Sequence, residues 1–256
     1  MSTPVTPEPH DLWAPLRATT QARIGLGRAG RSLPTSAVLD LQASQAAARD
    51  AVHVPLDVAA FLPGLTEIGL GEPVVLTSKA VDRSSYLRRP DLGREPVGLD
   101  ALPTDGAQVA LVIADGLSSK AVADHTVAMV QALVTELSEF TIAPPVIVTQ
   151  ARVAIGDWIG QAMGVDTVLV LIGERPGLSV ADSLGIYLTH NPRPGRNDAE
   201  RNCISNIHPP EGLSYASAAA TAARLVRGAR VLGRSGVDLK DTAEPAALDG
   251  SSPTVG

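Results

Sequence analysis

The sequence has a single cysteine, Cys203, among its 256 residues. One cysteine excludes an internal disulfide and is typical of proteins kept in a reducing compartment. No apolar run approaches the roughly 20 residues needed to cross a bilayer. The amino terminus also lacks the basic segment followed by an apolar segment that marks a secretory signal. These absences predict a soluble, cytoplasmic protein with no membrane partner.

Positive charge is scarce as well. The formal net charge is -6, and lysine occurs only at Lys79, Lys120 and Lys240. Proteins that bind nucleic acids usually carry a basic surface, so this balance argues against a nucleic-acid partner.

The motifs of common metal and nucleophile sites are missing. No HExxH, paired CxxC, P-loop or GxSxG motif occurs. The histidines are scattered, at His10, His53, His125, His190 and His208. Cys203 could act as a nucleophile, but no partner base is visible, and a lone intracellular cysteine is more often a small buried apolar residue. We therefore expect no metal site and no nucleophilic catalysis by Cys203.

Strands and helices alternate from residue 108 onward. Aliphatic and β-branched runs predict strands at 109–113, 146–149, 167–172 and 184–189. Apolar periodicity predicts helices at 118–138, 152–163 and 214–232, the second of them ended by Gly164. This alternation is typical of an α/β fold with a doubly wound, mostly parallel, Rossmann-like sheet.

The segment before residue 100 has a different character. We expect a flexible tail at 1–15 and a mainly helical amino-terminal region at 16–100, with helices at 36–52 and 56–62 and an extended piece at 74–77. The polar, turn-rich run at 84–93 ends this region. Residues 101–256 then form the α/β domain, with a frayed end beyond Asp241.

A formal GxGxxG motif occurs at Gly25, Gly27 and Gly30. The dinucleotide fingerprint needs a strand before its glycines and a helix that begins at the third. Here the preceding TTQARI is a poor buried strand, and Pro34 interrupts a helix after Gly30. We favour an Arg- and Gly-rich loop that lets another backbone or subunit come close.

The stretch from Val165 to Ile207 is the most informative for function. Its strand at 167–172 is predicted to be buried on both faces and ends in the polar turn GERPG at 173–177. Three strand exits, at 115–118, 150–153 and 173–176, should meet at the carboxyl edge of the sheet, where open α/β sheets bind ligands. Glu174 beside Arg175 could be an ordinary surface ion pair. In this rigid turn, and with Val153 nearby, Glu174 could equally contact a bulky organic cofactor.

Seven blocks, in order over roughly residues 17–240, resemble the small (light) subunit of ethanolamine ammonia-lyase. They are ARIGLGRAG (22–30), ARDAVH (48–53), YLRRPDLG (86–93), VIADGLS (112–118), RVAIGD (152–157), GERPGL (173–178) and RNCISNI (201–207).

The resemblance implies a subunit of an adenosylcobalamin-dependent carbon–nitrogen lyase that converts ethanolamine to acetaldehyde and ammonia by a radical mechanism. It implies that cobalamin lies between residues 101–256 and a TIM-barrel large subunit, which carries the catalytic side chains and contacts residues 16–100. The two subunits would form a hetero-oligomer, active only when complete. Carried over block by block, the cobalamin contacts of this chain are Val153, Glu174 and Cys203.

Two further expectations follow from that resemblance. The Asp-x-His-x-x-Gly loop that replaces the lower base in many cobalamin enzymes does not occur, since Asp124 directly precedes His125. A base-on cofactor is therefore expected. The short Pro-rich start does not look like an amphipathic microcompartment-targeting helix, so a cytosolic complex and an encapsulated one both stay open.

Two other functions remain alternatives. One is a stand-alone nucleotide-binding α/β enzyme that uses Gly25, Gly27 and Gly30. The other is a structural partner subunit that has no contact with the cofactor.

Overall fold

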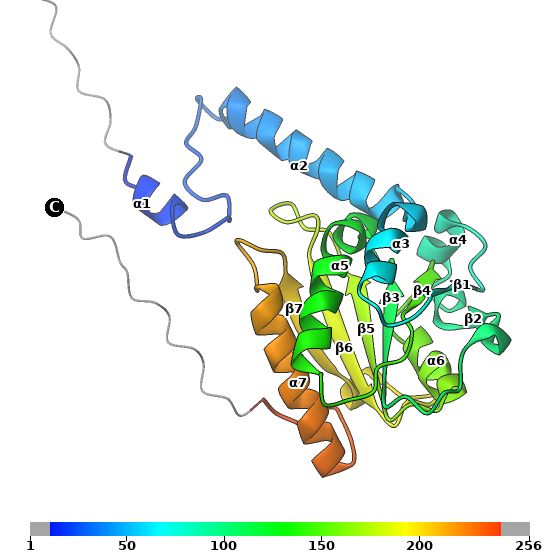
Figure 1. Cartoon of the computed structure of the whole chain (residues 1–256). Helices are drawn as coiled ribbons and strands as arrows, with labels where there is room; N and C mark the ends of the chain where they lie inside the picture. The colour runs from blue at the N-terminus through cyan, green and yellow to red at the C-terminus, as the bar shows by residue number, and fades with distance from the viewer. Residues whose placement is uncertain (1–10, 242–256) are drawn as a thin grey trace, which may run out of the picture.

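The computed structural model describes residues 11–241, which fold around one seven-stranded sheet (Figure 1). The strand order is β2-β1-β4-β3-β5-β6-β7. The strands are β1 Val74–Ser78, β2 Pro96–Val97, β3 Val109–Ala114, β4 Val146–Thr149, β5 Thr167–Gly173, β6 Leu184–His190 and β7 Asn202–Ile207. The predicted tail at residues 1–10 and the end beyond Asp241 lie outside the described residues.

The middle of the sheet is parallel and its margins are antiparallel. Strands β1, β4, β3 and β5 pair in parallel, whereas β2 is antiparallel to β1, β6 to β5 and β7 to β6. Because β7 reverses the direction of β6, it points the same way as β5. The prediction of a mostly parallel α/β sheet is confirmed.

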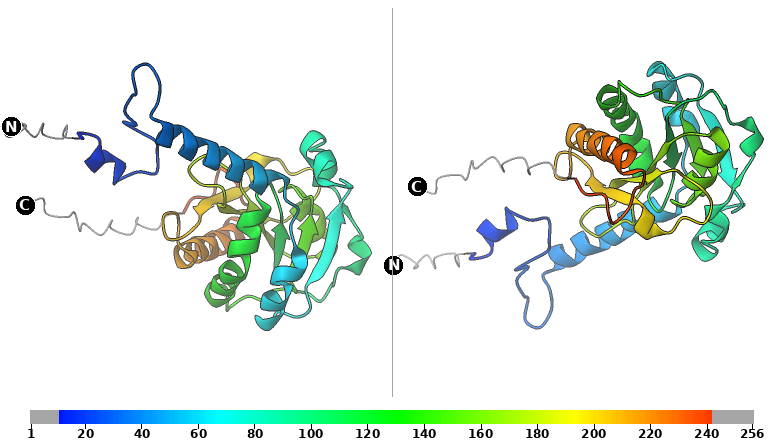
Figure 2. Two further views of the ribbon diagram at one scale, coloured as in Figure 1. Left: turned by 90° about the horizontal axis from the view of Figure 1, so that it is seen from above. Right: turned by 90° about the horizontal axis from the view of Figure 1, so that it is seen from below.

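Helices cover both faces of this sheet (Figures 1 and 2). On one face lie α3 (Val58–Glu67), α5 (Ser119–Glu136) and α7 (Tyr215–Leu232), and on the other lies α6 (Ile155–Met163). Among residues 11–241, no helix combines the length and the apolar character needed to cross a membrane.

Each face has its own hydrophobic core, because side chains of a strand alternate between the two faces. On β3, Leu111 and Ile113 join the core under α5 and α7, whereas Ala110 and Val112 join the core under α6. Every residue of β3 and β5 is buried. This confirms the prediction that the strand at 167–172 is buried on both faces.

Some element boundaries differ from the sequence-based expectation. Helix α6 begins at Ile155 rather than at residue 152, because residues 152–154 form a turn whose carbonyls cap the first helical N–H groups. Gly164 ends α6 in the left-handed conformation (φ 69°), as predicted. The turn-rich run at 84–93 contains the short helix α4 (Arg83–Arg88), which begins where Asp82 accepts a 2.6 Å hydrogen bond from the N–H of Ser85.

The amino-terminal part contributes to the sheet as well as to helices. Strands β1 and β2 extend the sheet beside β4, so the sheet includes residues on both sides of residue 100. Helices α1 (Ala14–Arg17) and α2 (Thr35–His53) and the loop between them form an arm that stands away from the sheet (Figures 1 and 2). Of the 19 residues of α2, only Ala51 is buried. The remaining elements are the short 3-10 turns η1 Leu92–Arg94, η2 Leu99–Ala101 and η3 Asp198–Glu200.

Candidate cofactor-binding site

Asp115 ties the exits of β3 and β4 together at the carboxyl edge of the sheet. Its carboxylate accepts hydrogen bonds from the backbone N–H groups of Gln150 (2.8 Å) and Ala151 (2.9 Å), and Arg83 Nη1 lies 3.2 Å away. Burial raises the pKa of Asp115, while these N–H groups and Arg83 act in the opposite direction. The predicted meeting of these two strand exits is therefore present and is fixed by one buried side chain.

Two glycines bring the exit of β5 against the exit of β3. A Cβ on Gly173 would lie 2.0 Å from the carbonyl oxygen of Ser118, and one on Gly116 would lie 2.2 Å from the carbonyl oxygen of Gly173. Gly116 also has a φ of 58°, which side chains rarely adopt. Only glycine fits at these two positions, so the edge from β3 to β5 is closely packed.

Helix α4 lies over the exits of β3 and β4. Tyr86 is fully buried there, and its hydroxyl donates to the carbonyl of Ala151 over 3.2 Å. The guanidinium of Arg152 lies 4.3 Å from the centre of the Tyr86 ring. Burial raises the pKa of Tyr86 to about 12, so the hydroxyl stays protonated and the contact with Ala151 is kept.

An open hollow of about 320 Å³, which we call the carboxyl-edge hollow, lies beside this cluster. Its lining includes Tyr86, Arg152, Val153, Glu174 and Tyr187. Two of the three predicted contact residues, Val153 and Glu174, thus share one hollow at the edge of the sheet where ligands were expected. A mixed lining of arginine, carboxylate, phenol and aliphatic groups suits an organic ligand with both polar and apolar parts.

Glu174 is held in place by hydrogen bonds and not by its neighbour Arg175. Its Oε2 accepts from the hydroxyl of Ser183 and, over 3.1 Å, from the backbone N–H of Asn206. Within residues 11–241, Oε1 accepts no hydrogen bond and Glu174 makes no ion pair with Arg175. The surface ion pair considered from sequence is absent from this part of the chain. One oxygen of a fixed carboxylate is left to accept from a ligand.

Cys203 lies next to the carboxyl-edge hollow, across from Tyr187 in the register of β6 and β7. Its side chain is exposed, which differs from the small buried residue that a lone cysteine usually is. Nearby protein atoms partly desolvate the thiol and raise its pKa; the Tyr187 hydroxyl opposes this shift and the charge of Glu174 adds to it. A protonated thiol without a base is a poor nucleophile, but it can still contact a ligand.

The start of β7 is anchored by a buried ion pair between Arg201 and Asp157. Arg201 donates from Nη1 and Nη2 to the two carboxylate oxygens of Asp157 over 2.6 and 2.7 Å, and both side chains are 2% exposed. Nη1 also donates to the hydroxyl of Thr189 over 2.8 Å. This network joins β7 to α6 and β6, and so sets the position of Cys203 two residues further on.

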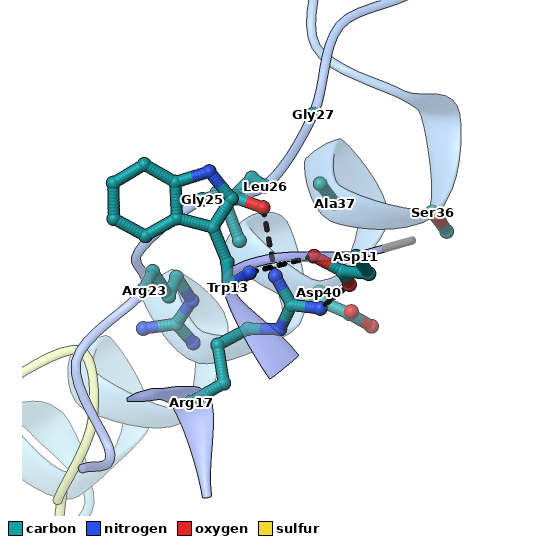
Figure 3. Close-up of a pocket in the computed structure, with 10 residues that line it drawn as sticks. All are labelled: Asp11, Trp13, Arg17, Arg23, Gly25, Leu26, Gly27, Ser36, Ala37 and Asp40. Atoms are coloured by element: carbon teal, nitrogen blue, oxygen red, sulfur yellow. Dashed lines mark hydrogen bonds and ion pairs between the residues drawn. The ribbon is translucent and has the colours of Figure 1, made fainter. Parts of the chain in front are cut away.

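The GxGxxG glycines lie in the arm, and Figure 3 shows Gly25 close to Trp13. None of the three lines the carboxyl-edge hollow, although Arg23 Nη1 in the same loop donates to the carbonyl of Leu178 over 3.0 Å. All three have positive φ values, of 56°, 74° and 66°. A Cβ on Gly25 would lie 2.1 Å from the Trp13 ring, and Arg17 donates to the carbonyl of Gly25 over 2.8 Å. No strand precedes these glycines among residues 11–24, so the dinucleotide fingerprint is not formed. Instead the glycine loop lets Trp13 and Arg17 come close, in agreement with the favoured interpretation.

Sequence reasoning missed Tyr86 and Tyr187 as lining residues. Tyr86 belongs to a segment that was expected to be only a turn-rich boundary. Tyr187 lies inside β6, and its place beside Cys203 depends on β7, a strand that was not predicted. The one available signal was that both are among only three tyrosines in a chain with few aromatic residues.

Fold and site together define a mostly parallel α/β protein with an open hollow of mixed lining at the carboxyl edge of its sheet. Comparison with known proteins makes this specific. Residues 10–240 match the family model of the ethanolamine ammonia-lyase light chain. The chain is 61% identical over 239 residues to the ethanolamine ammonia-lyase small subunit of Rhodococcus erythropolis, with 93% of each chain covered. It is 49% identical over 257 residues to that of Pseudomonas fluorescens strain Pf0-1, covering 96% of this chain and 93% of that protein. The chain belongs to the family of ethanolamine ammonia-lyase small subunits.

Proposed function

We propose that this chain is the small subunit of an adenosylcobalamin-dependent ethanolamine ammonia-lyase, which converts ethanolamine to acetaldehyde and ammonia together with a TIM-barrel large subunit. The proposal rests on family membership and on one observation of geometry. Val153 and Glu174 share the carboxyl-edge hollow, and Cys203 lies across from Tyr187, which lines it. Residues that are distant in sequence thus surround one place.

The residues present fit a cobalamin. The periphery of a corrin carries amide groups that donate and accept hydrogen bonds around an apolar ring. Glu174 offers the unused acceptor Oε1, and Arg152 has a buried Nε with no hydrogen-bond partner in the described part of the chain. Buried donors without partners are rare in folded proteins, so an Nε in this position favours a ligand or partner group. Val153 offers an aliphatic contact between them.

The carboxyl-edge hollow supports binding between two subunits. Pockets that enclose a drug-sized ligand measure about 300 to 1,000 Å³, and a cobalamin is much larger than such a ligand. A hollow of about 320 Å³ can therefore cover only part of it. The remaining surface would be covered by the large subunit, which would also exclude water from the reacting atoms.

Each contact residue has a separate part in this proposal. Adenosylcobalamin would supply the radical chemistry when bound, while the protein supplies binding and orientation. Glu174, held by Asn206 and Ser183, would accept from a corrin amide. Val153 would pack against the ring periphery, and the protonated thiol of Cys203 would form a second wall. The catalytic side chains would lie on the large subunit, and the cofactor would stay base-on.

The arm supports a contact with the large subunit. Several large apolar side chains of the arm are exposed, namely Leu16 (51%), Leu33 (41%), Val38 (37%) and Leu39 (58%). Clustered exposed apolar residues mark interaction surfaces more often than scattered ones do. We propose that residues 16–100 contact the large subunit through this arm, which would leave residues 101–256 to hold cobalamin.

Reconstitution tests the proposed function. The purified chain, a large subunit encoded in the same genome and adenosylcobalamin are mixed with ethanolamine, and ammonia release is measured. We expect ammonia only when all three components are present. Activity without the large subunit, or full activity without this chain, would show that the assignment is wrong. Tight binding of NAD or ATP by the isolated chain would instead favour the nucleotide-binding alternative.

A further inference from the structure

A second hollow adjoins the carboxyl-edge hollow and has a different chemical character. It measures about 440 Å³ and shares Arg152, Val153 and Tyr187 with its neighbour. Two more arginines line it, Arg94 and Arg196. We call it the arginine hollow.

Positive charge in the arginine hollow is not neutralised by its own lining. Asp198 is the one acidic residue there. Its side chain is 95% exposed and forms an ion pair with Nε of Arg201, 3.5 Å away. Arg201 does not line the hollow. In a chain whose net charge is -6, three arginines around one concave surface are a local excess of positive charge. Such a surface attracts anions.

Two of these arginines lack a carboxylate partner among residues 11–241. Arg94 is exposed at the end of η1 and makes no ion pair there. The side chain of Arg152 makes one hydrogen bond within the described residues, from Nη2 to the carbonyl of Tyr86 over 3.4 Å, and its buried Nε has no partner. Arg94 and Nη1 of Arg152 are not buried and make no side-chain hydrogen bond within the described residues, so these donors are available to a ligand. Most arginines among residues 11–241 are paired with acids.

The other contacts of these side chains hold them in position. The guanidinium of Arg152 lies over the Tyr86 ring, and a Cβ on Gly93 would lie 3.0 Å from Arg152 Cγ, so the stem has little room to move. Arg196 is paired with Glu200, and its Nη2 donates to the carbonyl of Asn191 over 3.0 Å. Arginines that are fixed before binding lose less conformational entropy when an anion arrives.

Backbone groups add to this arrangement. Val153 and Ala154 line the hollow at the amino end of α6, and within the described residues their N–H groups have no backbone acceptor. The amino end of a helix favours negative charge, because its free N–H groups and the positive end of its dipole lie there. The hollow thus combines side-chain and backbone donors.

We propose that the arginine hollow is a subsite for a phosphate-type oxyanion. A carboxylate is saturated by a single arginine fork, whereas a tetrahedral oxyanion directs its oxygens to several donors at once. Three guanidinium groups around one hollow suit the second shape better. Two sources share this chemistry: the phosphodiester of a base-on cobalamin seated in the adjoining hollow, and free phosphate. The first source rests on the proposed function; the subsite itself does not.

Paired ligands test this proposal on the assembled two-subunit complex. Dissociation constants are measured by spectral titration for cyanocobalamin and for cobinamide, which lacks the nucleotide loop and its phosphodiester. The variants are Arg94→Met, which changes an exposed side chain, Arg152→Met, and Arg152→Lys, which keeps the charge. Arg234→Met, at a side chain 60% exposed and away from both hollows, is the matched control.

We expect Arg94→Met and Arg152→Met to raise the Kd for cyanocobalamin about tenfold, since each removes a charge-assisted hydrogen bond. Cobinamide binding should not change, Arg152→Lys should recover part of the loss, and Arg234→Met should behave as wild type. Calorimetry with inorganic phosphate alone forms the second arm. Phosphate binding that is lost in the two Met variants, with cyanocobalamin unaffected, would support the subsite and assign it to free phosphate.

Two results would overturn the subsite. One is that the variants bind cyanocobalamin and phosphate as the wild type does. The other is an equal loss of cyanocobalamin and cobinamide affinity in both Met variants, which would mean that the arginines act on the corrin and not on the phosphodiester. A wild-type complex that binds neither corrinoid would contradict the proposed function instead, and the phosphate arm would still decide the subsite.

Discussion

The backbone N–H of Asn206 donates a 3.1 Å hydrogen bond to Oε2 of Glu174. This contact joins the exit of β5 to the end of β7, across the strand that separates them. Asn206 has a φ of 64°, in the left-handed region that asparagine tolerates better than most residues. The carboxylate of Glu174 is therefore oriented by a residue of the RNCISN block, which also contains Cys203.

This orientation makes the Glu174→Gln change informative. Glutamine has one acceptor where glutamate has two. If its oxygen keeps the bond from Asn206, an N–H₂ group replaces Oε1, the acceptor that we propose for the ligand. We expect the Kd of the two-subunit complex for cobalamin to rise about tenfold, with a loss of unfolding free energy of about 1 kcal/mol or less. Titration and urea unfolding measure the two effects, and Glu211→Gln, at an exposed residue, is the control. Unchanged cobalamin affinity would remove Glu174 from the contacts.

Gly173 should be intolerant of any side chain. The Cβ of alanine would lie 2.0 Å from the carbonyl oxygen of Ser118, and a backbone atom cannot rotate away. We expect Gly173→Ala to lower the free energy of unfolding by about 3 kcal/mol or more. A Cβ on Gly177, in the same loop, would lie 3.4 Å from the carbonyl oxygen of Val180, so Gly177→Ala should fold normally. Equal urea midpoints for the two variants would contradict the close packing of β3 against β5.

Cys203 should react slowly with alkylating agents. Its thiol is accessible, but partial desolvation and the charge of Glu174 raise its pKa, so little thiolate is present at neutral pH. We expect carbamidomethylation by iodoacetamide, followed by mass spectrometry of this chain, to be slower in the folded protein than after unfolding in urea. Cobalamin should slow it further in the complex. Alkylation that is as fast in the folded as in the unfolded chain, or that cobalamin leaves unchanged, would count against this description.

His190 makes stability depend on pH. Burial lowers its pKa below the ordinary value of 6.5, with Asp166 opposing the shift and Arg230 and Arg196 adding to it. Between the two pKa values the unfolded chain binds more protons than the folded chain, so the free energy of unfolding falls as the pH drops through 6.5.

The slope that one such group contributes is at most about 1.4 kcal/mol per pH unit. His190→Gln should remove this part of the slope, whereas His53→Gln, at an exposed residue, should keep it. Urea unfolding at a series of pH values measures the difference. Parallel profiles for the wild type and His190→Gln would show that burial of the ring has no such effect.

The central strands were predictable because they are buried on both faces. Strand β4 occupies the predicted residues 146–149, and β3, β5 and β6 each extend one residue beyond the expected end. Continuous aliphatic runs give a clear signal when every position packs against a helix. Helices α2 and α7 were likewise predicted within one residue at each end.

The edge strands could not be predicted in the same way. In β7 only Ile204 and Ile207 are buried, and polar residues occupy the other positions. This pattern contains neither a continuous apolar run nor a strict alternation of apolar and polar residues. The pairing of Tyr187 with Cys203 depends on that strand, so the place of Cys203 at the candidate site was expected from the family resemblance alone. The hydrogen bond from Asn206 to Glu174 depends on the same strand and was not predicted.

The arginine hollow was also out of reach. Arg94, Arg152 and Arg196 belong to three different segments, and each would be an ordinary surface arginine in isolation. Their convergence depends on the packing of α4 and η1 over the exit of β4, where Arg152 N donates to the carbonyl of Gly93 over 2.7 Å. No local pattern records that contact.

Val153 allows the most direct test of the central claim, because it is half-buried and lines both hollows. The measurement is equilibrium binding of cyanocobalamin to the assembled two-subunit complex that carries Val153→Trp. We predict a rise in Kd of about 100-fold or more, with sedimentation showing that the subunits still associate. Val231→Trp, at a side chain 92% exposed, should bind as the wild type does. An assembled Val153→Trp complex with unchanged cobalamin affinity would contradict the claim that this edge of the sheet holds the cofactor.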